Sequence, residues 1–325
     1  MRWMDDQARR LVAALGDGLP VSVRPYADLG ARIGLSGAEV VSTLRALRDA
    51  RSVRRVGAVL SPSALGYIAV LGALAVSEDA LDDAASVLAS VPNATHAFEM
   101  DDRYRLWYVL GTPSMARLEI AESEIAGRLG VADRFRVLPA EEYRVTHGFD
   151  ADGAPEPPAP AADAMHLDHD ARALVRLLQG DLPLEERPFS ALAQTLAECG
   201  YDADEQQVLE QVRALVAGGV VRRFGVTIHE RAEPWRLALA TWVNPRHAAG
   251  AGSLIAAFPE VLHCFDRRVP GGGRAIVAVI ETPDRATLDR TIERIGVGAD
   301  LGAPRIAYSL RELKRAPMRY FSEGD

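Results

Sequence analysis

Two histidines and two arginine pairs stand in equivalent places along the sequence, and both residue types can do chemistry. His96 and His263 each follow a short apolar stretch and open a predicted strand. An imidazole titrates near neutral pH, so it can deliver a proton. The pairs Arg54-Arg55 and Arg222-Arg223 carry planar guanidinium groups, which bind carboxylates in a bidentate manner. Each has a plainer alternative, because a lone strand histidine is commonly structural and a basic pair at a wing edge is commonly solvated or touches a DNA backbone.

These residues recur because the chain is a tandem duplication. The segment DDQARRLVAALGDGLPVSVRPYADL reappears as DHDARALVRLLQGDLPLEERPFSAL, with eleven identities at a constant shift of 163 residues. After a five-residue insertion, Val53-Arg54-Arg55 matches Val221-Arg222-Arg223. Between the copies, DADGAPEPPAPAADA is rich in Pro and Ala, which favours an extended spacer. The sequence therefore predicts two copies of one unit, joined by a linker.

The same order of elements is expected in each copy. Leu11, Val12 and Leu15 have the spacing of an amphipathic helix, Pro25 suits the start of a second helix, and Ser36 suits the N-cap of a third. The segment SVRRVGAVL, interpreted as a strand pair, completes a winged helix-turn-helix. The remainder of the first copy predicts strands over 67–76, 94–100, 104–111 and 134–138, and helices over 79–88 and 114–129. In the second copy, strands are expected near 235–243, 261–267 and 275–280, and helices near 248–258 and 283–295.

The βαββαβ order is that of a ferredoxin-like domain, so the fold class is α+β, a tandem repeat of winged helix-turn-helix plus ferredoxin-like domain. The predicted domains are 1–62 (first winged helix), 63–149 (first ferredoxin-like domain), 150–165 (linker), 166–230 (second winged helix) and 231–325 (second ferredoxin-like domain).

Composition excludes several classes of protein. The 325 residues are 48% hydrophobic and carry 37 basic against 45 acidic residues, for a net charge of -8, which counts against a protein that mainly grips nucleic acid. No apolar run reaches the roughly 20 residues of a membrane span, and MRWMDDQARR lacks a signal-peptide core, so we expect a cytoplasmic protein with no membrane partner. Cys199 and Cys264 have no CxxC spacing, and the remaining histidines have no metal-ligand spacing, so no metal site is expected.

A winged helix followed by a ferredoxin-like domain resembles the architecture of leucine-responsive (Lrp/AsnC) regulators. More specifically, RRVGAVLSPSALGY, THAFEMDDRYRLWYV and LPAEEYRV resemble the first subunit of siroheme decarboxylase, and GGVVRRFGVTI, FPEVLHCF and ELKRAPMRYF resemble its partner subunit. Joined in one chain, they resemble the fused siroheme decarboxylases of heme d1 biosynthesis (NirDL type), which are related to the paired subunits of siroheme-dependent heme synthesis.

The resemblance implies a carboxy-lyase. It implies that two acetate side chains of siroheme lose carbon dioxide without a cofactor, giving 12,18-didecarboxysiroheme, and that iron enters only as part of the substrate. A carboxylate on a methylene beside a pyrrole can leave if a protonated ring accepts its electrons and a proton then reaches the new carbon. Such a site needs a proton donor, and cations that hold the other carboxylates.

The same resemblance assigns roles to particular residues. His96 and His263 become the acid/base residues, and because side chains alternate along a strand, we expect each to share a face with Phe98 or Phe265. The residues expected to bind substrate are Arg54, Arg55, Arg222, Arg223, Tyr104, Arg105, Trp107 and Arg267. Adjacent strand residues face opposite ways, so one arginine of each pair is expected in the pocket; Arg55 and Arg223 are preferred, and their neighbours stay open.

The two copies are not expected to be equal. The family commonly has asparagine where this chain has Arg105, and the second copy's GGGRAIVAV keeps neither the tyrosine nor the tryptophan of YRLWYV. Strand aromatics are commonly packing residues, and Arg267 has a solvated hairpin end as its alternative. Whether His263 serves its own site or supports one composite site therefore stays open.

Two other functions stay open as alternatives. The first is a DNA-binding regulator of the Lrp/AsnC type, whose third helix enters the major groove. Residues 36–50 have a net charge of zero and residues 200–218 a net charge of -3, which disfavours contact with phosphates, so DNA is not an expected partner. The second is a tetrapyrrole binder without turnover. We expect siroheme as the partner molecule and an internal pseudo-dimer of the two halves, and further homodimerisation stays open.

Overall fold

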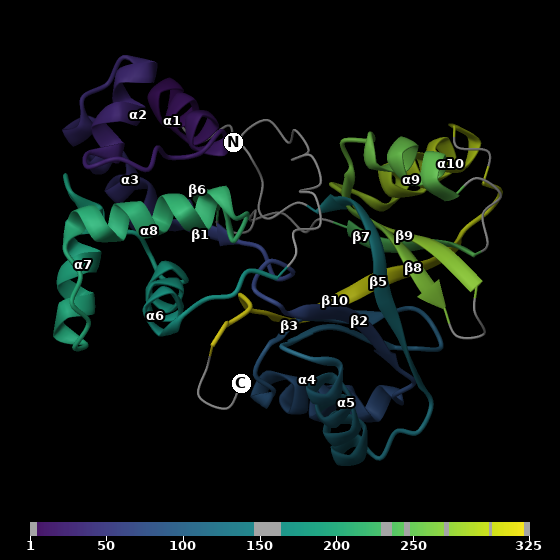
Figure 1. The fold of residues 1–325 in the computed structure, drawn as a ribbon. Coiled ribbons are helices and arrows are strands. Elements are labelled where there is room, and N and C mark those ends of the chain that lie inside the picture. The colour runs from purple at the N-terminus through teal and green to yellow at the C-terminus, as the bar shows by residue number, and fades with distance from the viewer. Residues whose placement is uncertain are drawn as a thin grey trace.

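The computed structural model describes residues 5–145, 164–228, 236–243, 248–269, 273–298 and 301–321. These residues form two lobes, one built from short helices and a small sheet, the other around a closed β-barrel (Figure 1). Most of the predicted linker, residues 150–163, lies outside the described residues.

The helical lobe contains both winged-helix copies. The first copy supplies α1 (Asp6–Gly16), α2 (Pro25–Ile33) and α3 (Gly37–Asp49), and the second supplies α6 (His169–Leu178), α7 (Pro188–Glu198) and α8 (Glu205–Ala217). Local signals set the helix starts, as predicted: Pro25 opens α2, and Ser36 caps α3 through a reciprocal pair of bonds with Glu39.

The wing differs from the expected strand pair. The segment SVRRVGAVL forms a single strand, β1 (Val53–Leu60), whose antiparallel partner is β6 (Val221–Ile228) of the other copy. Gly57 lies opposite Gly225 in this ladder. A Cβ on Gly57 would lie 2.7 Å from the carbonyl oxygen of Gly180, so the close approach of the second copy requires glycine here. The expectation of a hairpin within each copy is therefore wrong.

The two winged helices share one apolar core, to which all six helices and both wing strands contribute. Polar contacts between the copies repeat the duplication: the guanidinium of Arg45 on α3 donates to the carbonyl of Leu184 (2.7 Å), and that of Arg213 on α8 donates to the carbonyl of Val21 (3.3 Å). The third helix of each copy is thus fastened to the other copy.

The second lobe is an eight-stranded closed barrel in the order β10-β3-β4-β2-β5-β8-β9-β7. The first half supplies β2 (Ile68–Leu74), β3 (Ala94–Met100), β4 (Leu106–Thr112) and β5 (Arg134–Val145), and the second supplies β7 (Arg236–Val243), β8 (Val261–Val269), β9 (Gly273–Thr282) and β10 (Arg305–Arg315). The halves meet at two antiparallel seams, β5 with β8 and β10 with β3. The structure thus shows the internal pseudo-dimer that we expected.

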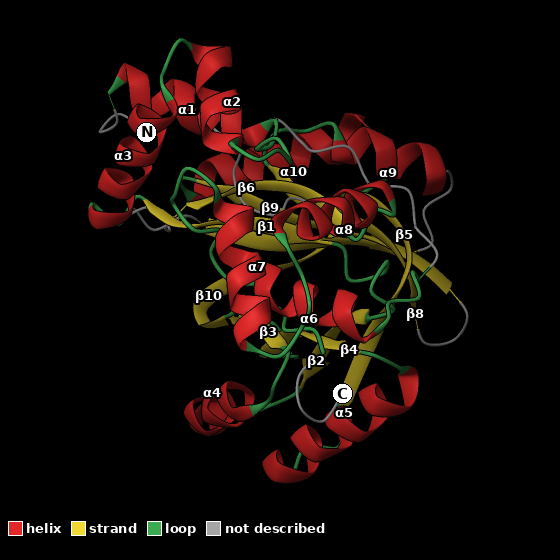
Figure 2. Cartoon of the chain, turned by 60° about the vertical axis from the view of Figure 1, so that its left-hand side comes forward, coloured by secondary structure: helices red, strands yellow, loops and turns green. Residues whose placement is uncertain are grey.

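Helices cover the barrel on opposite sides. A short 3-10 turn (Glu78–Ala80), α4 (Leu81–Ser90) and α5 (Met115–Leu129) belong to the first half, and α9 (Ala248–Ala256) and α10 (Arg285–Gly298) to the second; Figures 1 and 2 show the two helix pairs on opposite faces. Each pair packs on its own apolar cluster, and a separate cluster joins both halves, with Ala73, Met100, Trp107, Leu239, Val277 and Ala307 buried in it. Side-chain alternation therefore gives each strand one face toward its helices and one toward the other half. None of the described helices has the length and apolar character needed to cross a membrane.

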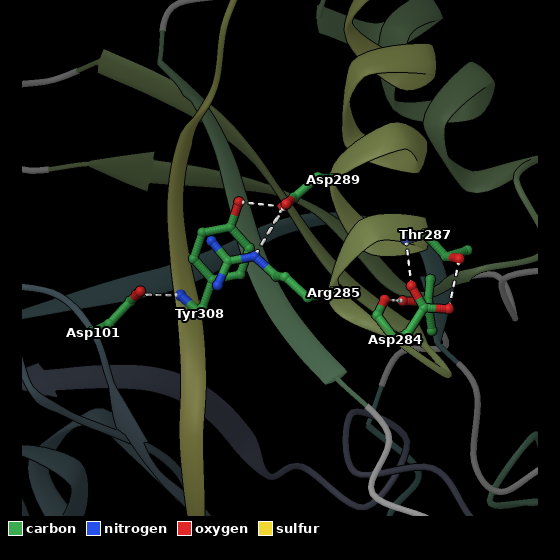
Figure 3. A network of polar contacts seen from close by, with 7 residues as sticks. Asp101, Asp284, Arg285, Thr287, Asp289 and Tyr308 are labelled. Atoms are coloured by element: carbon green, nitrogen blue, oxygen red, sulfur yellow. Dashed lines mark hydrogen bonds and ion pairs between the residues drawn. The ribbon is translucent and has the colours of Figure 1, made fainter.

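A polar network fixes the register of β10 against β3 (Figure 3). The backbone N–H of Tyr308 donates to Asp101 (2.6 Å), and its hydroxyl donates to Asp289 of α10 (2.7 Å). The guanidinium of Arg285 lies over the Tyr308 ring, 3.2 Å from its centroid. Just before this helix, Asp284 accepts bonds from the backbone and hydroxyl of Thr287, each 2.8 Å. Strand β10 is thereby tied to α10 and to the end of β3.

Candidate active site

His96 and His263 lie at equivalent positions of the barrel, on β3 and β8. His96 is opposite Val109 of β4, and His263 is opposite Val279 of β9. The ring of His96 stacks with that of Phe98 at 6.3 Å and an interplanar angle of 16°, and the ring of His263 stacks with that of Phe265 at 5.8 Å and 15°. The prediction that each histidine shares a strand face with the phenylalanine two residues on is confirmed. Both imidazoles are half-buried, so a ligand can approach them.

The surroundings of His96 disfavour its charged form. Burial, and then the positive charge of Arg315, lower the pKa of His96 to about 4. Its Nδ1 lies 3.1 Å from the hydroxyl oxygen of Thr95. At neutral pH the imidazole is therefore uncharged in the free protein. Carboxylates brought close by a ligand would raise the pKa again, because they stabilise the imidazolium.

An aromatic group adjoins His96 from the first half. Trp107 is 6% exposed and directly opposite Phe98, and its Nε1 has no hydrogen-bond partner within the described ranges. Phe135 of β5 meets Trp107 edge-on at 5.3 Å and Tyr104 at 4.5 Å. Phe135 was not among the predicted site residues, and its apolar position at the start of the last strand of the first half was the signal for it in the sequence. Trp107 therefore lies in the wall of the barrel interior. This position is consistent with a packing role and with a role in binding a ligand.

Tyr104 and Arg105 lie at the edge of this group. The Tyr104 hydroxyl donates to Asp133 at 3.1 Å, and burial together with this bond raises the pKa of Tyr104. The guanidinium of Arg105 is 3.9 Å from the carboxylate of Glu78. Both side chains keep partial solvent contact, so both remain accessible to a ligand.

The arginine pairs lie on the wing strands rather than on the barrel. Arg55 donates to the carbonyls of Gln179 (2.7 Å), Gly180 (3.1 Å) and Ala58 (3.0 Å), and burial lowers its pKa. Its guanidinium is thus engaged in joining the two copies, whereas its neighbour Arg54 is exposed. A carboxylate-binding role for Arg55 stays a prediction, and the structure makes Arg54 the more accessible member of the pair.

In each pair, the guanidinium of the second arginine lies over the glycine two residues later. A Cβ on Gly57 would lie 3.1 Å from the Nη1 of Arg55, and a Cβ on Gly225 would lie 2.7 Å from the Nη1 of Arg223. Arg222 has a buried Nε with no hydrogen-bond partner among the residues that the structure describes. Burial raises the pKa of the Tyr320 hydroxyl, and the positive charge of nearby Arg222 lowers it by a smaller amount. The backbone of Tyr320 in turn is bound to the side chain of Gln179. Arg222 thus lies at the junction of the two lobes.

The second histidine has different neighbours. Arg267 lies two residues beyond Phe265, is 5% exposed, and places its guanidinium 3.9 Å from the centroid of the Phe265 ring. The corresponding residue of the first copy, at the shift of 167 that relates the histidines, is the apolar Met100. Val277, opposite Phe265, stands where the first copy has Trp107. The two histidines therefore face unlike walls, one aromatic and one cationic.

A cavity of about 400 Å³ lies elsewhere, between α5 and β5. Its lining residues are Tyr108, Glu119, Glu122, Ser123, Arg134, Phe135 and Arg136. Glu122 and Glu119 pair with Arg136 at 2.8 and 3.4 Å, and these two carboxylates balance the charges of Arg134 and Arg136 in the lining. A polyanionic tetrapyrrole gains little there, and neither histidine lines the space. We therefore take the barrel histidines, and not this cavity, as the candidate site.

Comparison with known proteins places the chain in a family. Residues 8–54 and 171–222 match the model of the siroheme decarboxylase NirDL-like HTH domain, and residues 64–143 match the AsnC-like ligand binding domain. The siroheme decarboxylase NirDL subunit of Paracoccus denitrificans is 32% identical over 280 residues, covering 82% of each chain. The siroheme decarboxylase of Hydrogenobacter thermophilus is 26% identical, covering 98% of this chain and 96% of its own.

The fold agrees with this. The crystal structure of the siroheme decarboxylase NirDL superposes with a TM-score of 0.79 at 23% identity, covering 98% of this chain and 95% of the other. The winged helices, the closed barrel and the duplicated order of elements are thus shared along nearly the whole chain. This chain belongs to the siroheme decarboxylase NirDL family.

Proposed function

We propose that this protein removes carbon dioxide from two acetate side chains of siroheme and releases 12,18-didecarboxysiroheme. The observation that carries the proposal is the pair of histidines at equivalent barrel positions, each stacked on a phenylalanine, in a chain related to siroheme decarboxylases over most of its length. A structure of the same fold was obtained in complex with an iron-uroporphyrin III analogue, which supports a tetrapyrrole as the ligand class.

Each step exchanges one carboxylate for one proton. The bond between the acetate methylene and its carboxylate breaks, carbon dioxide leaves, and the electron pair passes into the protonated macrocycle. A proton from a histidine then adds to the methylene carbon and forms a methyl group. No electron is gained or lost, so the reaction needs no redox cofactor, and we propose that iron takes part only as the metal of the substrate.

The chain supplies three kinds of group for this reaction. His96 and His263 exchange the proton. Arg54, Arg222 and Arg267 are the cations that we expect to bind carboxylates that do not react; Arg105 is kept as a further candidate. Trp107 and Phe135 offer an apolar wall for the macrocycle, and an apolar setting favours loss of a charged carboxylate as neutral carbon dioxide.

Anaerobic incubation with siroheme tests the proposal. Mass spectrometry of the tetrapyrrole should show the loss of two carbon dioxide molecules per macrocycle, and a shifted absorption band with unchanged mass would instead show a binder without turnover. His96→Ala should lower turnover far more than it lowers siroheme binding. Equal losses in the two measurements would identify His96 as a structural residue.

The DNA-binding alternative is disfavoured by contacts of the third helices. Arg45 and Arg48 of α3 face the second copy, where they bind the carbonyl of Leu184 and the carboxylate of Asp181 (2.6 Å). Arg213, the one basic residue of α8, binds the carbonyl of Val21. The basic residues of the two third helices are therefore engaged within the protein. We expect no salt-sensitive binding to duplex DNA in a titration at physiological ionic strength.

A further inference from the structure

Strand β10 places a cation from the second half of the chain directly opposite His96. In the β10–β3 seam, Arg315 is the register partner of His96, and Ala97 is paired with Lys314. Residues directly opposite each other on antiparallel strands have Cβ atoms about 4.5–5.5 Å apart and point to the same face. The side chain of Arg315 is 38% exposed, so it can reach a ligand that approaches the imidazole.

The backbone around Arg315 is fixed on both sides. The ammonium of Lys314 donates to the carbonyls of Leu88 (2.7 Å) and Val91 (3.0 Å) at the end of α4. The backbone N–H of Ala316 donates to the carbonyl of Thr95 at 2.7 Å. Glu312, three residues earlier on the strand, pairs with the Arg315 guanidinium at 2.5 Å. The strand is therefore fixed with Arg315 opposite His96, close enough for its charge to act on the imidazole.

The second histidine has a register partner of another residue type. The partner of His263 in the β5–β8 seam is Val145, an uncharged residue. The histidine and the phenylalanine therefore recur in both copies, whereas among the described register pairs a cation lies opposite the histidine only in the first. Conversely, the second copy carries a cation on the same strand as its histidine, Arg267. The first copy has Met100 at the corresponding position.

We propose that Arg315 binds a non-reacting carboxylate of the tetrapyrrole and so positions an acetate at His96, making this site a composite of both halves of the chain. The proposal rests on the proposed function. A cation on the reacting carboxylate would stabilise it against loss, so the bond must go to a second carboxylate of the same substrate. The cation also lowers the pKa of His96, which keeps the imidazole neutral until the substrate carboxylates arrive.

The test compares Arg315→Gln with Arg315→Lys and with the control Arg311→Gln. Arg311 lies on the same strand and is also ion-paired, to Asp82 (2.9 Å) and Glu99 (3.2 Å), but has no pairing with a histidine. Anaerobic absorption titration with siroheme should show the Kd raised by about ten-fold or more in Arg315→Gln, as expected for loss of a hydrogen bond to a charged group. Arg315→Lys should recover most of the affinity, and Arg311→Gln should bind like the unaltered protein.

A second readout is the product distribution. Arg315→Gln should accumulate a tetrapyrrole that has lost a single carbon dioxide, because the His263 site does not depend on this residue. An unchanged Kd in Arg315→Gln would overturn the proposal, and so would equal slowing of both losses, which would show one shared site. The titration measures binding and needs no turnover, so it tests Arg315 independently of the reaction. If the unaltered protein binds siroheme without releasing carbon dioxide, the decarboxylase function is refuted, and the Kd values still show whether Arg315 binds the substrate.

Discussion

The protonation of His96 gives a quantitative test of its role as proton donor. A pKa of about 4 means that about one molecule in a thousand carries the imidazolium at pH 7 in the free protein. Protonating it there costs about 4 kcal/mol. Because kcat/KM reports the free enzyme, it should rise about ten-fold for each pH unit between pH 8 and pH 6 if His96 donates the proton. A histidine with an ordinary pKa near 6.5 would instead level off within that range.

The assay is the initial rate of carbon dioxide release from siroheme under anaerobic conditions, measured over this range, in which the substrate carboxylates stay ionised. In the complex those carboxylates raise the pKa of His96, so kcat should level off at a higher pH than kcat/KM. His166→Asn is the control, since His166 is an exposed histidine outside the barrel and its loss should leave both profiles in place. An inflection of kcat/KM near pH 6.5 would refute the desolvation of His96, and a flat profile would refute donation by a titrating histidine.

Three further predictions concern stability, each measured by urea unfolding. Because the pKa of His96 is lowered in the folded protein, the unfolded chain binds the proton more tightly. The contribution of His96 to the free energy of unfolding is therefore complete above pH 6.5 and is lost as pH falls toward 4. In His96→Asn the loss of stability between neutral pH and pH 5 should be smaller by about 2 kcal/mol, and an unchanged acid dependence would contradict this. Arg55→Met should lower the free energy of unfolding by about 1.5–3 kcal/mol, because three hydrogen bonds to carbonyl groups disappear. The control Arg54→Met, at the exposed neighbour, should change it by less than about 0.5 kcal/mol. Equal effects of the two variants would show that the hydrogen bonds between the copies contribute nothing. Gly72→Ala would place a Cβ 2.3 Å from the Tyr108 ring and should cost about 1–3 kcal/mol, unless the ring moves without penalty, in which case the midpoint would not change.

The unequal surroundings of the two histidines bear on how duplicated sites diverge. His96 has an aromatic wall from its own half and a cation from the other half, while His263 has the buried Arg267 and the smaller Val277. The pseudo-two-fold arrangement of the barrel is preserved by the apolar pattern of its strands. The polar residues around the two histidines differ because different strands lie beside them: β10 pairs with the strand of His96, and β5 pairs with the strand of His263.

The local elements could be predicted because local chemistry sets them. Ser36 caps α3 and Pro25 opens α2 through contacts within a few residues. The expected strand 94–100 coincides with β3, since alternation along a strand is visible in the sequence itself. The same alternation correctly placed His96 and Phe98 on one face.

By itself, then, the sequence determined the duplication, the order of elements in each copy, the family to which its motifs point, and the phenylalanine that shares a strand face with each histidine. Only the tertiary structure decided that the wings pair between copies, that Arg55 is engaged by the carbonyls of Gln179 and Gly180 while Arg54 is exposed, and that Arg315 stands beside His96. The reason is physical. Caps and periodicity act over a few residues, whereas a seam between strands far apart in the chain is fixed by the packing of two complete halves, which no local pattern records.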